Sequence, residues 1–492
     1  MKRKWSFAAL TVALVASMAW GTHGSVLASQ SGEAKKVYLV TFKNALPANY
    51  DEMISRANGK VLRELPKIGA VEVESDDASF VANLKGQPSI HAANLEMKHQ
   101  LFDERLEPEA ADGMPVTDIP QPDQIDSYWD YQWDIKRVTH NGDSYELETG
   151  GTAGPDGEVK HKAVVGIIDS GIDPWHPDLR ANLLGGKNFV PAGADKDETG
   201  DPDDIKDRGG HGTHVAGAIA ANGKVKGVGP NLGIRVYRVF PESGSAPTSW
   251  IADALIQAAD DNVDVINMSI GGFDAISRYT YQNSGSYSDI ADVLVWKRAI
   301  QYAVKKGTTV VVSAGNESLN LNNPTEVTAY MNRTYGDLGL KFKGASMEVP
   351  GQIPGVITVS SSIQWSTDKI AFYSNYGSRS IDVAAPGGDN GPDYDKTGEL
   401  NQRDFHYRTL STWPTYLDPY FTSNLKGYAL LHGTSMASPK VAGIAGVIKA
   451  AHPDWKPAQV AAHIRKTAID YGKPGTDQLF GAGEANAYNS LK

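Results

Sequence analysis

The sequence predicts an open α/β fold, with a mainly parallel sheet covered by helices on both faces, that follows a small α+β unit. From about residue 128 onward, near-continuous apolar runs alternate with helical patterns, which is typical of strands buried on both faces of a parallel sheet. Before residue 101, short alternating runs and helices follow one another in the order βαββαβ. The two patterns therefore indicate two folded units.

Size and composition exclude several classes of protein. At 492 residues, the chain is several times longer than a domain of ~100 to 200 residues, so it holds more than one unit. Its 47 Lys and Arg against 58 Asp and Glu give a net charge of −11, and such a surface repels phosphate backbones, so we expect no nucleic-acid partner. The chain has no Cys, which excludes disulfides, thiolate metal sites and a Cys nucleophile.

Residues 1–28 have the features of a secretory signal peptide. Three basic residues at positions 2–4 precede an apolar run over 5–20, and small residues stand at positions 26 and 28. The alternative is a membrane anchor, but this run is shorter than the ~20 residues that a spanning helix needs. We therefore expect a secreted, extracellular protein without a membrane anchor.

The small unit is predicted over residues 29–100 and has the strand and helix order of a ferredoxin-like fold. Its expected strands are 37–42, 61–65, 70–74 and 93–97, and its expected helices are 48–58 and 77–85. Residues 101–127 are rich in Asp, Glu and Pro with little periodicity, which indicates an exposed linker. The second domain is expected over 128–492.

Five strands and five helices are expected in this second domain. The strands are 163–169, 234–240, 263–270, 308–314 and 356–360, and the helices are 211–221, 249–260, 292–305, 435–451 and 457–468. The polar stretches 191–209, 274–288, 317–343 and 389–425 are expected to be surface insertions.

Three segments place reactive side chains where a site is expected, beyond the carboxyl ends of parallel strands. The run 163–169 ends in Asp169, although an Asp there is also a common turn former. His211 and His214 begin a helix lined by small residues, and a metal site is an alternative reading of this pair, although no H-E-x-x-H pattern is present. Ser435 also starts a helix lined by small residues, where Ser is ordinarily a cap.

Together, these three residues have the parts of a nucleophilic triad. Ser is a poor nucleophile until a His takes its proton, and the His needs a carboxylate that fixes its tautomer and stabilises the imidazolium. Asn316 follows the run 308–314, and its amide could donate to an oxyanion. The chain contains no G-x-S-x-G segment, which argues against the α/β-hydrolase version of the triad.

These segments resemble the signatures of the subtilisin-like serine proteases in their order along the chain, their residue sequences and their position between strands and helices. The resemblance covers roughly residues 133–488. The resemblance implies a subtilisin-like fold. It also implies that Asp169 orients the base, His211 is the general base, Ser435 is the nucleophile and Asn316 is the oxyanion donor. The unit 29–100 is then similar to the inhibitory, fold-assisting propeptide of these proteases, an intramolecular partner of the catalytic domain.

The resemblance also implies a cleft for a polypeptide substrate. Its residues are one wall formed by Ser269, Ile270 and Gly271, and an edge strand formed by Ser243, Gly244, Ser245 and Ala246 that pairs with an extended peptide. Glu317 lies at the rim of the pocket for the residue before the cut. There we expect a solvated carboxylate that favours Lys or Arg by only ~0.2 to 1 kcal/mol. The alternative is a solvated rim charge without influence on the choice of substrate.

Catalysis of this kind needs no cofactor, and the question of structural calcium stays open. Asp178 matches one calcium ligand of relatives, yet the turn over 222–227 is shorter than their calcium loop. The acidic run 195–201 is similar to a calcium loop, but Lys206 stands where the bidentate Glu would be. We expect a solvated loop there.

The function expected from these observations is that of a secreted, monomeric serine endopeptidase made as a self-processing precursor. The sequence segments 133–136 and 237–240 look closest to those of the lantibiotic leader peptidases within this family. A dedicated leader peptidase with one substrate is therefore an alternative. A further alternative is an inactive homologue that binds peptides in the same cleft, but such proteins usually lose a member of the triad.

Overall fold

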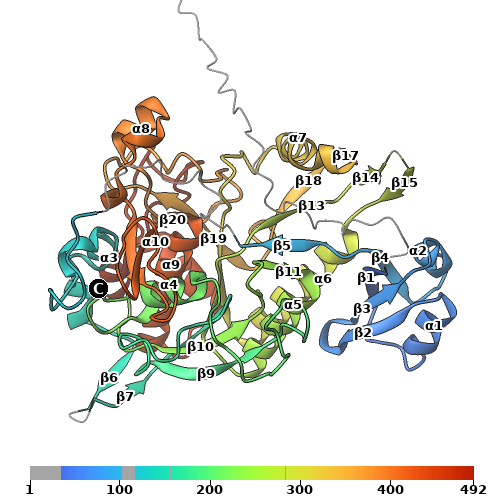
Figure 1. Ribbon diagram of the computed structural model, residues 1–492, viewed down its shortest axis with the longest axis horizontal. Helices are drawn as coiled ribbons and strands as arrows, with labels where there is room; N and C mark the ends of the chain where they lie inside the picture. Colours follow the sequence, from blue (N-terminus) through green and yellow to red (C-terminus); the bar gives the residue numbers. More distant parts are fainter. Residues whose placement is uncertain (1–34, 102–116, 155–156, 283) are drawn as a thin grey trace, which may run out of the picture. The chain divides into compact units, whose positions relative to one another are not determined.

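The computed structural model describes residues 35–101, 117–154, 157–282 and 284–492 (Figure 1). The predicted signal peptide over 1–28 and residues 102–116 of the predicted linker lie outside the described residues. Within the described ranges, no helix is long and apolar enough to cross a membrane.

A seven-stranded sheet forms the centre of the larger domain, and every neighbouring pair in it is parallel. In spatial order its strands are β20 (Val383–Pro386), β19 (Val356–Ser362), β16 (Thr309–Ser313), β12 (Val265–Met268), β8 (Val164–Asp169), β10 (Gly233–Arg238) and β9 (Leu183–Asn188). The five predicted strands are β8, β10, β12, β16 and β19. The two edge strands were not predicted, because β9 contains two Gly and β20 has four residues ending in Pro.

Helices cover both faces of this sheet, which confirms the predicted α/β class. The core on one face contains side chains of α4 (His211–Ala220) and α9 (Thr434–Ala451), and Val311 of β16 packs there. The core on the other face contains side chains of α5 (Thr248–Asp260) and α6 (Ile290–Lys306), together with Val310 and Val312. Successive residues of one strand thus fill opposite cores, as an apolar run without alternation predicts.

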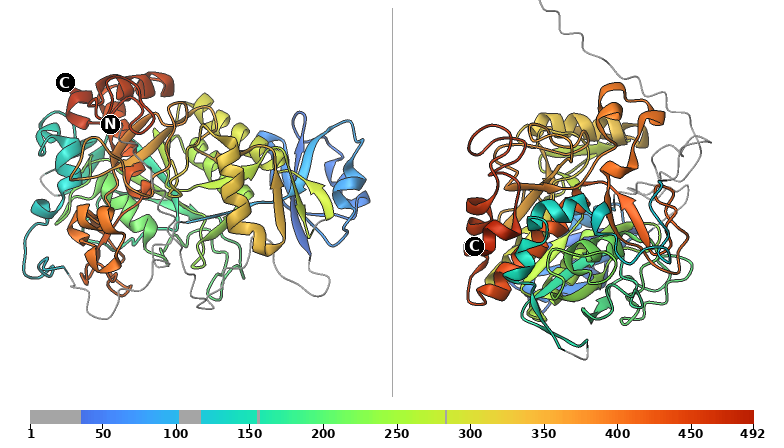
Figure 2. Two further views of the ribbon diagram at one scale, coloured as in Figure 1. Left: turned by 90° about the horizontal axis from the view of Figure 1, so that it is seen from above. Right: turned by 90° about the vertical axis from the view of Figure 1, so that its left-hand side faces the viewer.

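The N-terminal unit is an antiparallel sheet of order β2-β3-β1-β4 with two short helices. Along the chain its elements are β1 (Lys36–Phe42), α1 (Tyr50–Arg56), β2 (Lys60–Leu65), β3 (Ala70–Ser75), α2 (Phe80–Leu84) and β4 (Ile90–Leu95). This unit packs on α5 and α6, and Arg63 forms an ion pair of 2.6 Å with Asp253 of α5. Figure 2 shows the blue unit beside the yellow-green segments that contain these helices.

The remaining elements surround the central sheet. They are β5 (Lys98–Gln100), α3 (Trp133–Thr139), β6 (Gly151–Ala153), β7 (Val159–His161), β11 (Ser245–Pro247), β13 (Gly272–Ala275), β14 (Arg278–Tyr281), β15 (Ser284–Tyr287), α7 (Pro324–Tyr335), β17 (Leu340–Lys343), β18 (Ser346–Val349), α8 (Pro392–Thr397), β21 (Thr409–Thr412), β22 (Tyr428–Leu431), α10 (Pro457–Thr467) and α11 (Ala487–Leu491). The expectation that all of 389–425 lies at the surface is wrong. Strand β21 is buried, because it pairs with β22 and packs on α4.

Candidate active site

Asp169 and His211 lie together at the carboxyl end of the sheet. Asp169 is the last residue of β8 and has no exposed surface, and His211 is the first residue of α4. The Nδ1 atom of His211 lies 2.8 Å from Oδ1 of Asp169, which also accepts the backbone N–H of Ser170 at 2.7 Å. An Nδ1–H that faces the carboxylate leaves Nε2 as the basic nitrogen of a neutral imidazole.

The position of His211 depends on how α4 begins. The carboxylate of Asp207 accepts the backbone N–H of Gly210 at 2.8 Å, and both the N–H and the hydroxyl of Thr213, at 2.9 and 2.7 Å. It therefore satisfies N–H groups that a helix start leaves without partners. A Cβ on Gly212 would lie 2.2 Å from the carbonyl oxygen of Gly171, so Gly at this position lets α4 approach the end of β8.

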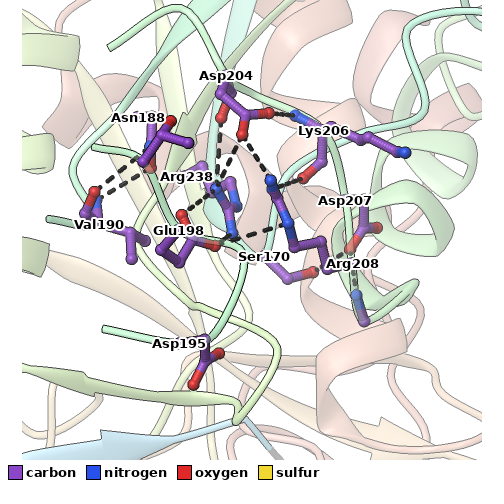
Figure 3. Close-up of polar contacts among 12 residues, drawn as sticks. Ser170, Asn188, Val190, Asp195, Glu198, Asp204, Lys206, Asp207, Arg208 and Arg238 are labelled. Atoms are coloured by element: carbon purple, nitrogen blue, oxygen red, sulfur yellow. Dashed lines mark hydrogen bonds and ion pairs between the residues drawn. The ribbon is translucent and has the colours of Figure 1, made fainter. Parts of the chain in front are cut away.

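A buried ion pair fixes the loop that leads into α4 (Figure 3). The side chains of Glu198 and Arg238 have no exposed surface and form two charge-assisted hydrogen bonds. Arg208 donates to Asp204 at 2.6 Å, and its Nε lies 3.7 Å from Glu198. The expectation that the acidic run 195–201 is a solvated loop is therefore wrong for Glu198, because the buried guanidinium of β10 draws this carboxylate inward.

The candidate metal ligands have protein partners. The carboxylate of Asp178 accepts the N–H of Val225 at 3.0 Å and the hydroxyl of Tyr428 at 3.1 Å. His214 Nε2 faces two backbone carbonyl oxygens on β21 and β22, and burial lowers its pKa to about 3. Lys206, which stands where a calcium loop would have its bidentate Glu, places its ammonium 4.3 Å from the ring centre of Tyr416. Among the described residues, no group of three His, Asp or Glu side chains could hold a metal ion.

Ser435 and Asn316 reach the same place from two other elements. Ser435 is the second residue of α9, it is 2% exposed, and its hydroxyl donates to the carbonyl oxygen of Ser269 over 3.4 Å. Asn316 follows β16, and its Oδ1 accepts the N–H and the hydroxyl of Thr434, at 3.0 and 2.7 Å. With its oxygen held in this way, the amide presents its NH₂ as a donor.

These groups line one cavity. His211, Asn316 and Ser435 all contribute to it. Trp413 and Tyr420 line it as well, although they come from the polar stretch 389–425 and carry no recognisable spacing in the sequence. A nucleophile, a base held by a carboxylate, and an amide donor around one cavity are the parts that acyl transfer needs.

A segment of the chain itself pairs with the edge strand that was predicted to bind the substrate. Strand β5 pairs antiparallel with β11, so that Gln100 lies opposite Ser245 and His99 opposite Ala246. The N–H of Leu101 donates to the carbonyl oxygen of Gly244 at 2.9 Å, and Leu101 lines the cavity that His211, Asn316 and Ser435 share.

The predicted wall of the cleft lies on the other side of this segment. Gln100 forms an antiparallel bridge with Gly271, so β5 runs between the edge strand and the wall. Ser269 and Ile270 are fully buried, and the Ser269 hydroxyl donates to the carbonyl oxygen of Ser435 at 2.8 Å. Ser243 does not take part in the pairing of β5 with β11, and its N–H donates to Asp195 at 2.9 Å.

Glu317 differs from the expected solvated rim charge. Its carboxylate accepts the side-chain amide of Asn375 at 2.6 Å and it is only partly exposed. Burial raises its pKa from 4.5 to about 7. The cause of the difference is that the side chain of Glu317 turns onto Asn375, which has no exposed surface.

Known proteins resemble this chain over the catalytic region and beyond it. The sequence pattern of the subtilase family matches residues 160–483. The nisin leader peptide-processing serine protease NisP of Lactococcus lactis subsp. lactis is 38% identical over 331 residues, which are 65% of this chain and 44% of that protein. The epidermin leader peptide-processing serine protease EpiP of Staphylococcus epidermidis is 28% identical over 489 residues, 98% of each chain. The crystal structure of EpiP from Staphylococcus aureus matches 93% of this chain and 98% of its own, with a TM-score of 0.73 and 26% identity.

Proposed function

This chain belongs to the subtilase family of serine proteases, and we propose that it is a secreted endopeptidase made as a self-processing precursor. In this proposal Asp169, His211 and Ser435 form the catalytic triad. The 2.8 Å contact between His211 and the buried Asp169, and the cavity that His211 shares with Ser435, support that assignment.

The proposed reaction passes through an acyl-enzyme. His211 Nε2 takes the proton of the Ser435 hydroxyl while Oγ attacks the carbonyl carbon of the scissile bond. The Asn316 amide and the Ser435 N–H then stabilise the oxyanion. The protonated His211 gives its proton to the leaving amine, and a water molecule, activated by the same His, hydrolyses the ester and restores Ser435.

The N-terminal unit acts in this proposal as an inhibitory and fold-assisting propeptide. The observation that carries it is the place of β5 between β11 and Gly271, with Leu101 at the catalytic cavity. A peptide held there excludes substrate. The same unit also supplies acceptors to the first turns of two helices of the catalytic domain, since Glu96 accepts the N–H of Ser249 at 2.6 Å and Asn94 accepts that of Ala291 at 2.7 Å.

A dedicated leader peptidase is the second candidate. The similarity to proteases named for processing the nisin and epidermin leader peptides favours it. Such an enzyme would cleave one leader, after a basic residue. We propose that the carboxylate of Glu317 beside Asn316 favours Lys or Arg there at a pH above its raised pKa of about 7, where it is mostly ionised. Secretion, a monomeric state and catalysis without a cofactor belong to both candidates.

Two experiments test the proposal. A fluorophosphonate probe should label the wild-type protein at Ser435, and an unlabelled but folded protein would mean a catalytically silent homologue. Digestion of casein and of a panel of leader peptides with Arg, Phe or Glu before the cut then separates the candidates. A general endopeptidase cleaves casein at many sites, whereas a dedicated peptidase cleaves only one leader.

A further inference from the structure

The side chain of His99 fills a pocket beside the substrate cleft. His99 is 2% exposed, it lies opposite Ala246 in the ladder, and it stands two residues before Leu101 at the catalytic cavity. This inference rests on the proposed function, in which β5 and Leu101 lie where a substrate lies. The pocket around His99 is then the pocket that receives the matching side chain of a substrate.

The walls of this pocket fit a flat ring. The His99 ring meets the fully buried Trp296 edge to face, with 5.2 Å between the ring centres and 75° between their planes. A Cβ on Gly272 would lie 2.5 Å from His99 Nδ1. Gly272 therefore leaves the space into which the imidazole fits.

The floor of the pocket is polar. Thr248 Oγ1 donates to Asp292 Oδ1 at 2.6 Å and lies 2.9 Å from His99 Nε2. A hydroxyl has a single proton, and a carboxylate at 2.6 Å is the stronger acceptor for it than the Met97 carbonyl oxygen at 3.5 Å. Thr248 therefore accepts, and His99 Nε2–H donates.

The carboxylate behind Thr248 is fixed in place. Asp292 has no exposed surface, and besides the Thr248 hydroxyl it accepts the Asn94 side-chain amide at 2.5 Å and the Met97 N–H at 3.1 Å. Both of these donors belong to the N-terminal unit, so in the mature protein the bound peptide must supply them, as a peptide with the sequence of residues 94–108 does. Because Asp292 holds the hydroxyl proton, the free lone pair of Thr248 points to the ring in the pocket. A phenyl ring or a methyl group in that position would leave this lone pair without a donor.

We propose that Thr248, oriented by Asp292, is a specificity-determining residue that selects histidine in the substrate two residues before the one that takes the place of Leu101. The ring shape is selected by Trp296 and Gly272, and the donor is selected by the hydroxyl. The triad and the oxyanion donors are untouched by this selection, so substrates without histidine are cleaved more slowly but by the same chemistry.

The test compares synthetic peptides with the sequence of residues 94–108 that carry His, Phe or Ala at position 99. We expect the mature wild-type protein to cleave the His peptide with a kcat/KM about threefold above that of the Phe peptide. This is the low end of what one neutral hydrogen bond gives, because Nδ1 of His99 is buried without a hydrogen-bond partner. Thr248→Val should reduce this ratio to about one. Ser249→Ala is the matched control, because it removes a neighbouring hydroxyl that lies beside Glu72 and Glu96 of the N-terminal unit and keeps the backbone N–H. It should retain the wild-type ratio.

The wild-type series decides the question even if Thr248→Val fails to mature. Equal kcat/KM values for the His and Phe peptides, or no cleavage of any peptide by a protein that digests casein, would overturn the inference and leave the proposed function standing. An unchanged ratio in an active Thr248→Val protein would also overturn it. A wild-type protein that digests neither casein nor any leader peptide would instead contradict the proposed function.

Discussion

The buried pair of Glu198 and Arg238 allows a quantitative test of how the loop before His211 is held. We predict that Glu198→Leu and Arg238→Met, each alone, strongly destabilise the folded protein. Each substitution removes one charge and leaves its partner buried, since both side chains have no exposed surface. The double variant Glu198→Leu/Arg238→Met removes both charges and should be closer to wild type than either single variant.

The expected magnitude follows from the partners that remain. Loss of one member of a buried ion pair costs about 3 to 5 kcal/mol. Without Arg238, the Glu198 carboxylate keeps the Arg208 guanidinium at 3.7 Å, whereas without Glu198 the buried Arg238 keeps only the Asp204 carboxylate at 3.9 Å and its carbonyl oxygen at 3.5 Å. The remaining charged partners lie at similar distances, and we therefore expect both single variants to lose stability within this range.

The free energy of unfolding is measured by urea titration of the full chain in a Ser435→Ala background, which prevents self-digestion. Glu52→Gln is the control, since its ion pair with Arg56 is exposed on α1 and its loss should leave the transition where it is. Single variants that lose less than about 1 kcal/mol, the range of surface pairs, would refute the reasoning. A double variant less stable than both singles would refute it as well.

Three further outcomes are expected. Asn316→Ala should lower kcat by ~10² to 10³-fold and leave KM nearly unchanged, the loss that removal of one oxyanion donor causes in a subtilisin, and a wild-type kcat in steady-state assays would rule out this role. Gly212→Ala should cost ~1 to 3 kcal/mol by overpacking against Gly171, so an unchanged melting temperature in the Ser435→Ala background would contradict the close approach of α4 to β8. Because burial raises the pKa of Glu317 to about 7 from 4.5, the folded state binds this proton more tightly than the unfolded chain, and stability should fall as the pH rises from about 4.5 to 7. Glu317→Gln should remove this pH dependence. If the free energy of unfolding changed with pH in the same way in the variant and the wild type, the raised pKa of Glu317 would be contradicted.

The four proposed catalytic residues were accessible from the sequence because each lies in a segment whose local pattern is strong. Asp169 ends an apolar run and Asn316 follows one, and both runs fit strands buried on both faces of a sheet. His211 and Ser435 begin helices lined by Ala and Gly. The carboxyl ends of parallel strands share one edge of the sheet, so the strand assignment predicts that Asp169 and Asn316 lie at that edge. The motifs at the two helix starts, through their resemblance to the subtilisin-like signatures, predict that His211 and Ser435 join them.

The features that could not be predicted from the sequence depend on contacts between residues far apart in the chain. Trp413 and Tyr420 reach the catalytic cavity because β21 pairs with β22 and lies against α4, and nothing within a polar stretch indicates such a partner. Glu198 is buried by an Arg that stands 40 residues further along the chain. The carboxylate of Glu317 is held by the buried Asn375, which stands 58 residues further along the chain.

The most direct test of the central claim is the mass of the purified full chain with and without the Ser435 hydroxyl. Wild-type protein should lose its N-terminal unit, with a new N-terminus after Leu101. Ser435→Ala should fold, since the change removes one hydroxyl, and should keep the unit intact and remain inactive. A purified, folded Ser435→Ala protein that still sheds its N-terminal unit without any other protease would contradict both self-processing and the assignment of Ser435 as the nucleophile that performs it.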